Sequence, residues 1–92
     1  MTVSEVISIM GLSESDFQEK GKKHIHQLAD SDAFSHLFNL LDDDDRFDED
    51  LDAQDINLFT NTVVFIDEEG ETECTLVADF ENDKYTVTVE EV

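Results

Sequence analysis

The sequence contains no proline, a single cysteine and only five basic residues against 25 acidic ones. Because the sequence contains no proline, no helix is interrupted by one. A lone cysteine, Cys74, cannot form an internal disulfide, which is compatible with a reducing cytoplasm. No run of about eighteen apolar residues occurs, so no transmembrane helix is expected. The opening residues, MTVSEVISIMG, contain no lysine or arginine, so a usual signal peptide is not expected either.

Motifs of the common catalytic sites are also absent. No nucleophile-elbow motif occurs, and Gly21-Lys22-Lys23 lacks the upstream glycine of a phosphate-binding loop. Many carboxylates lie close together in the sequence, whereas acid–base catalysis uses a pair of carboxylates positioned in a pocket. We therefore expect a protein that is not an enzyme and that carries no cofactor.

Neither the acids nor the histidines predict a dedicated metal site. A helix–loop–helix calcium site needs acids at loop positions 1, 3 and 5, glycine at 6 and glutamate at 12. Loops that start at Asp42 or Asp48 do not meet this pattern. His24 and His26 would point about 200° apart on a helix, because each residue turns the helix by about 100°. At most, weak and loose binding of divalent cations is expected at the carboxylates.

Apolar spacing in residues 1–41 predicts two to three helices. Thr2 and Glu5 have the spacing of a capping box, and Gly11 suits the end of the first helix. Residues 13–16 begin a second helix in a similar way, with a buried stripe of Phe17, Gly21, His24, Ile25 and Leu28. Asp30 or Ser31 can cap a third helix, in which the i, i+3, i+4, i+7 pattern is formed by Phe34, Leu37, Phe38 and Leu41.

The apolar period changes to two in residues 56–92 and predicts three antiparallel strands in a meander. A turn at Glu69-Gly70 would pair Phe65 with Cys74, Val63 with Leu76, and Phe59 with Phe80. A loop from Glu81 to Lys84 would pair Phe80 with Tyr85, Ala78 with Val87, and Leu76 with Val89. These pairs define one apolar face, and the opposite face would carry Val64, Ile66 and Val77.

The predicted fold class is therefore α+β, with two to three N-terminal helices packed on a three-stranded antiparallel β-meander. Residues 1–92 are expected to form a single domain. It comprises a helical part at 1–41, an acidic segment at 42–55 and an antiparallel sheet at 56–92.

The negative charge is concentrated in the last two of these parts. Residues 1–41 carry a net charge of −3, residues 42–55 carry −8, and residues 56–92 carry −9. In the acidic segment nine of fourteen side chains are carboxylates, and Arg46 is the only cation. Phe47 and Leu51 could anchor either a short helix or a loop there, and the poor helix propensity of Asp favours a loop.

A charge of −20 exceeds what solubility requires, which is a magnitude of about 2–8 for a small domain. As a helix, the acidic segment would span about 21 Å. Duplex DNA of that length carries about twelve negative charges, which is the same order as nine carboxylates. A groove lined with Lys and Arg would accept such a segment and release bound counterions. The only basic cluster, Lys20, Lys22 and Lys23, is not expected to bind nucleic acid, because the overall charge repels phosphates.

In size and charge the chain resembles small acidic DNA-mimic proteins, many of them from bacteriophages. Proteins of this class inhibit restriction enzymes, CRISPR effectors or other DNA-binding proteins, and they share no single fold. The resemblance implies an anti-defence inhibitor in the cytoplasm of a bacterial host. It would occupy the basic nucleic-acid-binding surface of a nuclease or similar protein, without binding nucleic acid or a membrane.

The predicted partner-binding residues are the acids of two dense stretches together with one aromatic residue beside them: Asp42, Asp43, Asp44, Asp45, Phe47, Asp48, Glu49, Asp50, Asp52, Asp55, Asp67, Glu68, Glu69, Glu71 and Glu73. An alternative is an immunity protein or antitoxin against one nuclease toxin, which would add aromatic anchors, with Phe47 as the candidate. A third possibility is an adaptor that dimerises through the sheet face of Val64, Ile66 and Val77.

Overall fold

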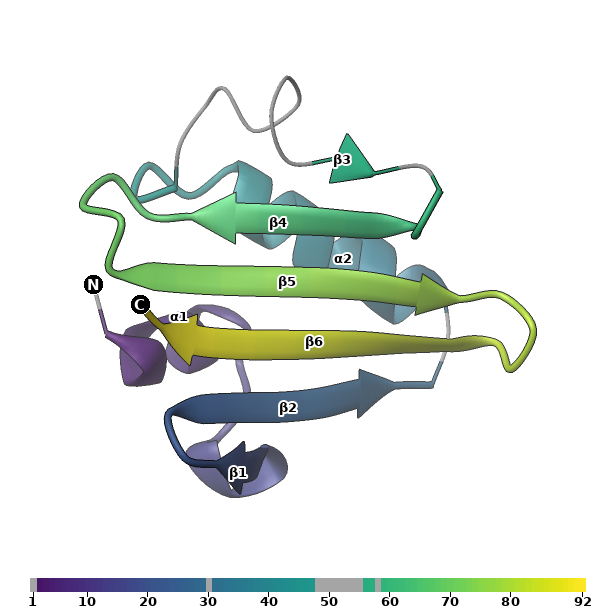
Figure 1. Cartoon of the computed structure of the whole chain (residues 1–92), viewed down its shortest axis with the longest axis horizontal. Coiled ribbons are helices and arrows are strands. Elements are labelled where there is room, and N and C mark those ends of the chain that lie inside the picture. The colour runs from purple at the N-terminus through teal and green to yellow at the C-terminus, as the bar shows by residue number, and fades with distance from the viewer. Residues whose placement is uncertain (1, 30, 48–55, 58) are drawn as a thin grey trace.

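The computed structural model describes residues 2–29, 31–47, 56–57 and 59–92. These residues form two α-helices, a 3₁₀ turn at Glu14–Asp16 and six strands. The helices are α1 (Val3–Ile9) and α2 (Ser31–Asp42), and the strands are β1 (Gln18–Lys20), β2 (Lys23–Leu28), β3 (Ile56–Asn57), β4 (Thr62–Ile66), β5 (Thr72–Asp79) and β6 (Lys84–Glu91). All strands belong to one antiparallel sheet in the order β1-β2-β6-β5-β4-β3. Both helices lie on one face of it (Figure 1).

The fold class predicted from the sequence is wrong. The sequence predicts a three-stranded meander beneath two to three helices, whereas the described residues form a six-stranded sheet with two α-helices. Two of the additional strands, β1 and β2, come from the part of the chain predicted to be helical. The third, β3, is a two-residue edge strand. The protein is therefore mostly sheet.

A β-hairpin replaces the predicted second helix. The Asp16 carboxylate accepts a hydrogen bond from the Ser13 N–H at 2.9 Å, as a capping box requires. The helix nevertheless ends after one 3₁₀ turn, and Phe17 is already extended. Gly21 takes a φ of +63° between β1 and β2, a conformation that suits a tight turn. All six residues of β2 then pair with β6, and this tertiary pairing overrides the helical spacing of the apolar residues.

The other two predicted helices are present. The Thr2 hydroxyl accepts a hydrogen bond from the Glu5 N–H at 3.3 Å, and Gly11 follows α1 with a φ of +73°. Of the two predicted caps of α2, Ser31 is the first helical residue and Asp30 lies outside the described residues.

Aromatic contacts join α2 to the sheet. Phe34 stacks on Tyr85 with 4.7 Å between ring centroids, and Phe38 meets Phe65 edge-on at 5.5 Å. These contacts place the apolar stripe of α2 against the inner face of the sheet. The core between the helices and this face includes Phe65, Cys74, Leu76, Val87 and Val89, which are fully buried.

The first hairpin of the predicted meander has the predicted register, with Phe65 opposite Cys74. The second is shifted by two residues, so that Ala78 lies opposite Tyr85 and Leu76 opposite Val87. Because side chains alternate between faces with a period of two, a two-residue shift keeps every side chain on its face. The predicted inner face is preserved for this reason.

The predicted pair of Phe59 and Phe80 does not form. β4 begins only at Thr62 and β5 ends at Asp79, so both phenylalanines lie in turns beyond the strand ends. Their side chains are 101% and 69% exposed. The alternation of apolar and polar residues therefore extends further along the sequence than β4 and β5 extend in the structure.

The second face of the sheet carries Val64, Ile66 and Val77, as predicted, and all three are half-buried. In the described part of the chain both helices lie on the opposite side, as Figure 1 shows. We call this second face the open face. No helix in the described residues is both long enough and apolar enough to cross a membrane.

Candidate functional site

Residues 42–45 comprise the last residue of α2 and the start of the loop that follows it. Asp42 is the last helical residue, the Asp43 N–H donates to the Asn39 carbonyl at 3.0 Å, and the Asp44 N–H donates to the Leu41 carbonyl at 3.3 Å. The free carbonyls at a helix C-terminus carry partial negative charge, so acids placed there destabilise the helix. The last turn of α2 contains no base to offset them. Asp42 and Asp43 are therefore unfavourable for the end of α2.

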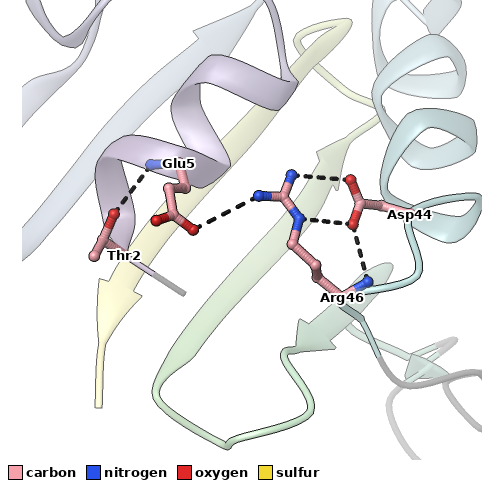
Figure 2. A network of polar contacts seen from close by, with 4 residues as sticks. All are labelled: Thr2, Glu5, Asp44 and Arg46. Carbon is pink, nitrogen blue, oxygen red and sulfur yellow. Dashed lines mark hydrogen bonds and ion pairs between the residues drawn. The ribbon is translucent and has the colours of Figure 1, made fainter.

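Arg46 connects this loop to α1. Its Nε and Nη2 donate to the two carboxylate oxygens of Asp44 at 2.9 and 3.0 Å, and its backbone N–H donates to the same carboxylate at 3.0 Å. Its Nη1 lies 3.6 Å from Glu5 Oε2, so the guanidinium stands between two carboxylates (Figure 2). Hydrogen bonds from Arg46 hold the pKa of Asp44 below its usual value, and the same bonds raise the pKa of Arg46. Arg46 therefore shapes the loop, and the acids it contacts neutralise its charge.

The same loop contacts the turn between β4 and β5. The Glu68 N–H donates to the Arg46 carbonyl at 2.9 Å, and Phe47 forms an isolated antiparallel bridge with Asp67. The Phe47 ring is buried and meets Phe65 edge-on, with 5.9 Å between centroids. Two acidic stretches that are separate in the sequence are thereby brought together.

We call the resulting surface the acidic end. It combines acids from α1, from the end of α2 and the loop after it, and from the β4–β5 turn: Glu5, Asp42, Asp43, Asp44, Asp45, Glu68, Glu69 and Glu71. A hollow of about 160 Å³ lies within it, lined by Glu5, Arg46, Asp67, Glu68 and Glu69. Except for half-buried Asp44, the members of the acidic end are exposed.

Not every predicted site residue belongs to this surface. Phe47 and Asp67 are only 3% and 4% exposed, which does not agree with their prediction as partner contacts. The Asp67 carboxylate accepts hydrogen bonds from the N–H groups of Glu71 and Thr72, at 2.7 and 3.3 Å, and so shapes the β4–β5 turn. The remaining predicted acids of the acidic segment lie outside the described residues: Asp48, Glu49, Asp50, Asp52 and Asp55.

Glu73 lies on the open face instead. It stands opposite Glu90 of β6, and Glu90 forms an ion pair with Lys23 at 3.2 Å. Like charges opposite each other on two strands destabilise a sheet, and Lys23 offsets part of that repulsion. The Glu73 side chain thus points to the open face, although Glu73 lies only two residues after Glu71 of the acidic end.

Glu5 is the member of the acidic end that sequence reasoning missed. Its spacing from Thr2 identifies it as part of a helix cap, and nothing near it in the sequence indicates a neighbour more than forty residues away. Its ion pair with Arg46 and its position in the lining of the hollow place it in the site.

Histidine and cysteine side chains can also bind metal ions or take part in catalysis. His24 and His26 lie on β2, where residues two apart point to the same face, so the predicted divergence is wrong. His26 Nδ1 lies 2.8 Å from the Asp16 carbonyl oxygen and must donate to it, since a carbonyl only accepts. The described residues place no three or more His, Cys, Asp or Glu side chains together in a way that could hold a metal ion. Burial raises the pKa of the Cys74 thiol to about 12, so this core residue stays protonated at neutral pH.

Comparisons of the chain with protein-family models, with curated proteins and with solved structures returned no match.

Proposed function

We propose that the protein is an acidic DNA-mimic inhibitor. On this proposal the acidic end occupies the basic nucleic-acid-binding surface of a nuclease or another DNA- or RNA-binding protein. A phage-encoded anti-defence role in the bacterial cytoplasm, against a CRISPR effector or a restriction enzyme, is the setting that the resemblance to DNA mimics implies. One observation carries the proposal: the contacts of Arg46 and Phe47 gather two separate acidic stretches at one end of the molecule.

The cost of these charges to the fold supports a role in binding. Asp42 and Asp43 stand at the negative end of the α2 dipole, where each acid is unfavourable by about 0.3–1 kcal/mol. Mutual repulsion among the exposed acids adds to that cost. A basic groove offsets both effects, because docking brings cations to the acids and releases counterions from both surfaces. The same field accelerates encounter with a basic target.

The test compares two neutralised surfaces with a matched control. Asp43 and Asp45 are changed together to Asn, and in a second variant Glu68 and Glu69 are changed together to Gln. The control removes two charges far from the acidic end, with Glu19→Gln and Asp32→Asn. All three variants lose the same charge, so a difference between them reports position. Asp44 is left unchanged because it holds Arg46 in place.

Inhibition is measured as protection of labelled duplex DNA from a panel of restriction endonucleases and CRISPR effector nucleases. We expect each acidic-end variant to inhibit about tenfold less well, which corresponds to about 1.4 kcal/mol of binding free energy, and the control to inhibit nearly as well as the wild type. Wild-type binding should fall steeply with added salt, and duplex DNA should compete with it. Binding to a target that persists unchanged in saturating duplex DNA would refute the proposal.

An immunity protein or antitoxin would use the same acidic end against one toxin nuclease. That alternative would add aromatic anchors beside the acids, and Phe47, the candidate there, is buried. It predicts inhibition of a single nuclease, whereas a general mimic of DNA inhibits several.

A second candidate function follows from the open face. Its aliphatic residues Val64, Ile66 and Val77 are not covered by either helix, which favours an adaptor that pairs through this sheet (Figure 1). The homodimer that this reading predicts is lost when Val64 and Ile66 are changed to Thr, while the Asp43 and Asp45 variant still pairs. Sedimentation equilibrium separates the two cases, and a chain that stays monomeric at high concentration excludes the adaptor.

A further inference from the structure

Two phenylalanines are exposed at the end of the sheet opposite the acidic end. Phe59 and Phe80 lie in the β3–β4 and β5–β6 turns, and their side chains are 101% and 69% exposed. The strands that carry them are hydrogen-bonded neighbours: the Ala78 N–H donates to the Asn61 carbonyl at 3.0 Å, two residues from each phenylalanine. Figure 1 shows both turns at one end of the sheet and the β4–β5 turn at the other. Single exposed apolar residues are common, but two aromatic rings at one end form a candidate contact surface.

The turn that carries Phe59 is held by side-chain hydrogen bonds. The Asn57 side-chain oxygen accepts from the N–H groups of Phe59 and Thr60, at 3.0 and 3.2 Å. The Thr62 hydroxyl donates to the Thr60 carbonyl at 3.1 Å, and Asn61 takes a φ of 52°, which Asn tolerates better than most residues. Side-chain hydrogen bonds therefore hold the backbone at Phe59 and at the residues that follow it.

The turn that carries Phe80 is built in a similar way. The Asp79 carboxylate accepts from the backbone N–H of Asn82 at 3.3 Å and from its side-chain amide at 2.8 Å. The hydrogen bond from the Asn82 side chain is the main reason that the pKa of Asp79 lies below its usual value. Asp83 completes the turn with a φ of 50°. Because hydrogen bonds already hold the backbone beside both rings, less conformational entropy is lost when a partner binds them.

The charges around the rings limit what can cover them. The β5–β6 turn and the strand ends beside it contribute Asp79, Glu81 and Asp83 against a single base, Lys84. A second copy of this chain would bring the same negative charges, and nucleic acid or an anionic membrane would bring phosphates. All three are repelled, whereas a protein surface with basic residues is attracted.

We propose that Phe59 and Phe80 form an aromatic contact surface that inserts into an apolar recess of a partner protein, with Lys and Arg around the rim of the recess. Aromatic residues are enriched in the cores of protein interfaces, and charged pairs at the rim favour the correct partner. This surface is separate from the acidic end and needs no mimicry of DNA. It would add shape specificity to a molecule whose charge alone discriminates little among basic partners.

A small host molecule with an apolar cavity and a cationic rim tests the aromatic contact surface directly. Amino-substituted β-cyclodextrin has an apolar cavity that admits a phenyl ring and a rim of ammonium groups, and unsubstituted β-cyclodextrin has the same cavity without charge. Isothermal titration calorimetry measures host binding by every variant, and shifts of the Phe59 and Phe80 ring protons in NMR titrations locate the host on the wild type. The variants are the Phe59→Ser, Phe80→Ser double change, the Glu81→Gln, Asp83→Asn double change, and the control Val92→Ser, which removes another exposed apolar residue at the opposite end of the sheet.

We expect the cationic host to bind the wild type more tightly than the neutral host. The phenylalanine double change should weaken cationic-host binding by about tenfold or more, as loss of an anchor residue does. The charge variant should bring the two hosts closer together, and Val92→Ser should bind like the wild type. Equal binding of the cationic host by the wild type and the phenylalanine variant would show that only the overall charge matters, and would overturn the proposal.

Photo-crosslinking identifies the occupant. The photoreactive residue p-benzoylphenylalanine is placed at position 59, 80 or 92 of the full chain. Each variant is expressed in the cells in which the protein naturally occurs. We expect adducts specific to positions 59 and 80, in which the crosslinked partner peptide contains apolar residues beside Lys or Arg. An equal yield of adducts at all three positions contradicts the proposal, and so does the absence of adducts at every position. Adducts formed only between copies of this chain contradict it as well. Failure of the DNA-competition test of the acidic end would leave these results unchanged.

Discussion

Phe47 lies inside the acidic segment of the sequence yet is 3% exposed in the structure, which makes it a sharp test of the fold. Its ring meets Phe65 edge-on at 5.9 Å, and its backbone pairs with Asp67. Truncating a buried phenylalanine to alanine costs about 3–5 kcal/mol. The chain of 92 residues is expected to have a free energy of unfolding of about 5–14 kcal/mol. Phe47→Ala should therefore remove a large share of the total stability.

Phe59→Ala is the matched control, because the same side chain is removed where it is 101% exposed. An exposed substitution of this kind changes stability by less than about 0.5 kcal/mol. In thermal unfolding followed by circular dichroism, we expect Phe47→Ala to lower Tm by at least about 12 °C, at about 4 °C or more per kcal/mol. Phe59→Ala should leave Tm almost unchanged. Phe47→Leu keeps most of the buried volume and should fall between them, which preserves the comparison if the alanine variant does not fold.

Similar Tm values for Phe47→Ala and Phe59→Ala would refute the burial of Phe47 and the placement of the loop that follows α2. A Phe47→Ala variant with wild-type stability that fails to inhibit its target would instead restore Phe47 as a partner contact.

Three further predictions concern the corrected hairpin, the Arg46 network and the charge field. Gly21→Ala would stabilise a helix by about 1 kcal/mol, but at a φ of +63° we expect it to destabilise the protein by about 1 kcal/mol in urea unfolding; a gain in stability would favour the helix. Arg46→Gln should cost about 1 kcal/mol at pH 7, since the pair is partly exposed. The pKa of Asp44 is lowered in the folded state, so its stabilisation is present above the unfolded pKa and disappears as the pH falls through the folded value; wild type and variant should converge there, and a constant difference down to low pH would show that the carboxylate is not the relevant partner. Raising NaCl from low to physiological concentration should raise Tm, because screening weakens repulsion beyond about 10 Å at 0.1 M; a Tm indifferent to salt would mean that the acids are well separated.

Local sequence signals predicted those elements whose stability depends mainly on nearby residues. The cap of α1, the apolar stripe of α2 and the pairing of Phe65 with Cys74 all follow from spacings within one element or one short hairpin. The hairpin of β1 and β2 could not be predicted in this way, because β2 gains its hydrogen bonds from β6, about sixty residues later in the chain. The capping residues Ser13 and Asp16 made a helix the better local choice, and only the distant pairing reversed it.

The candidate site was predicted in part for a similar reason. A run of like charges can be seen in a sequence, and residues 42–45 and 68–71 were identified from it. Whether a member of such a run faces solvent depends on what the rest of the chain places over it. The burial of Asp67 and the position of Glu73 on the open face could therefore not be read from the charge pattern.

The sequence alone determined the composition of the surface charge, the amphipathic stripes of the two helices and the faces of the three C-terminal strands, because each depends on residue type and short-range spacing. Only the tertiary structure decided which strands became neighbours, that Arg46 would join Glu5 to Asp44, and that Phe47 would be buried while Phe59 and Phe80 remained exposed. Those outcomes depend on contacts between residues far apart in the chain, where closing the chain and burying apolar surface outweigh local preference.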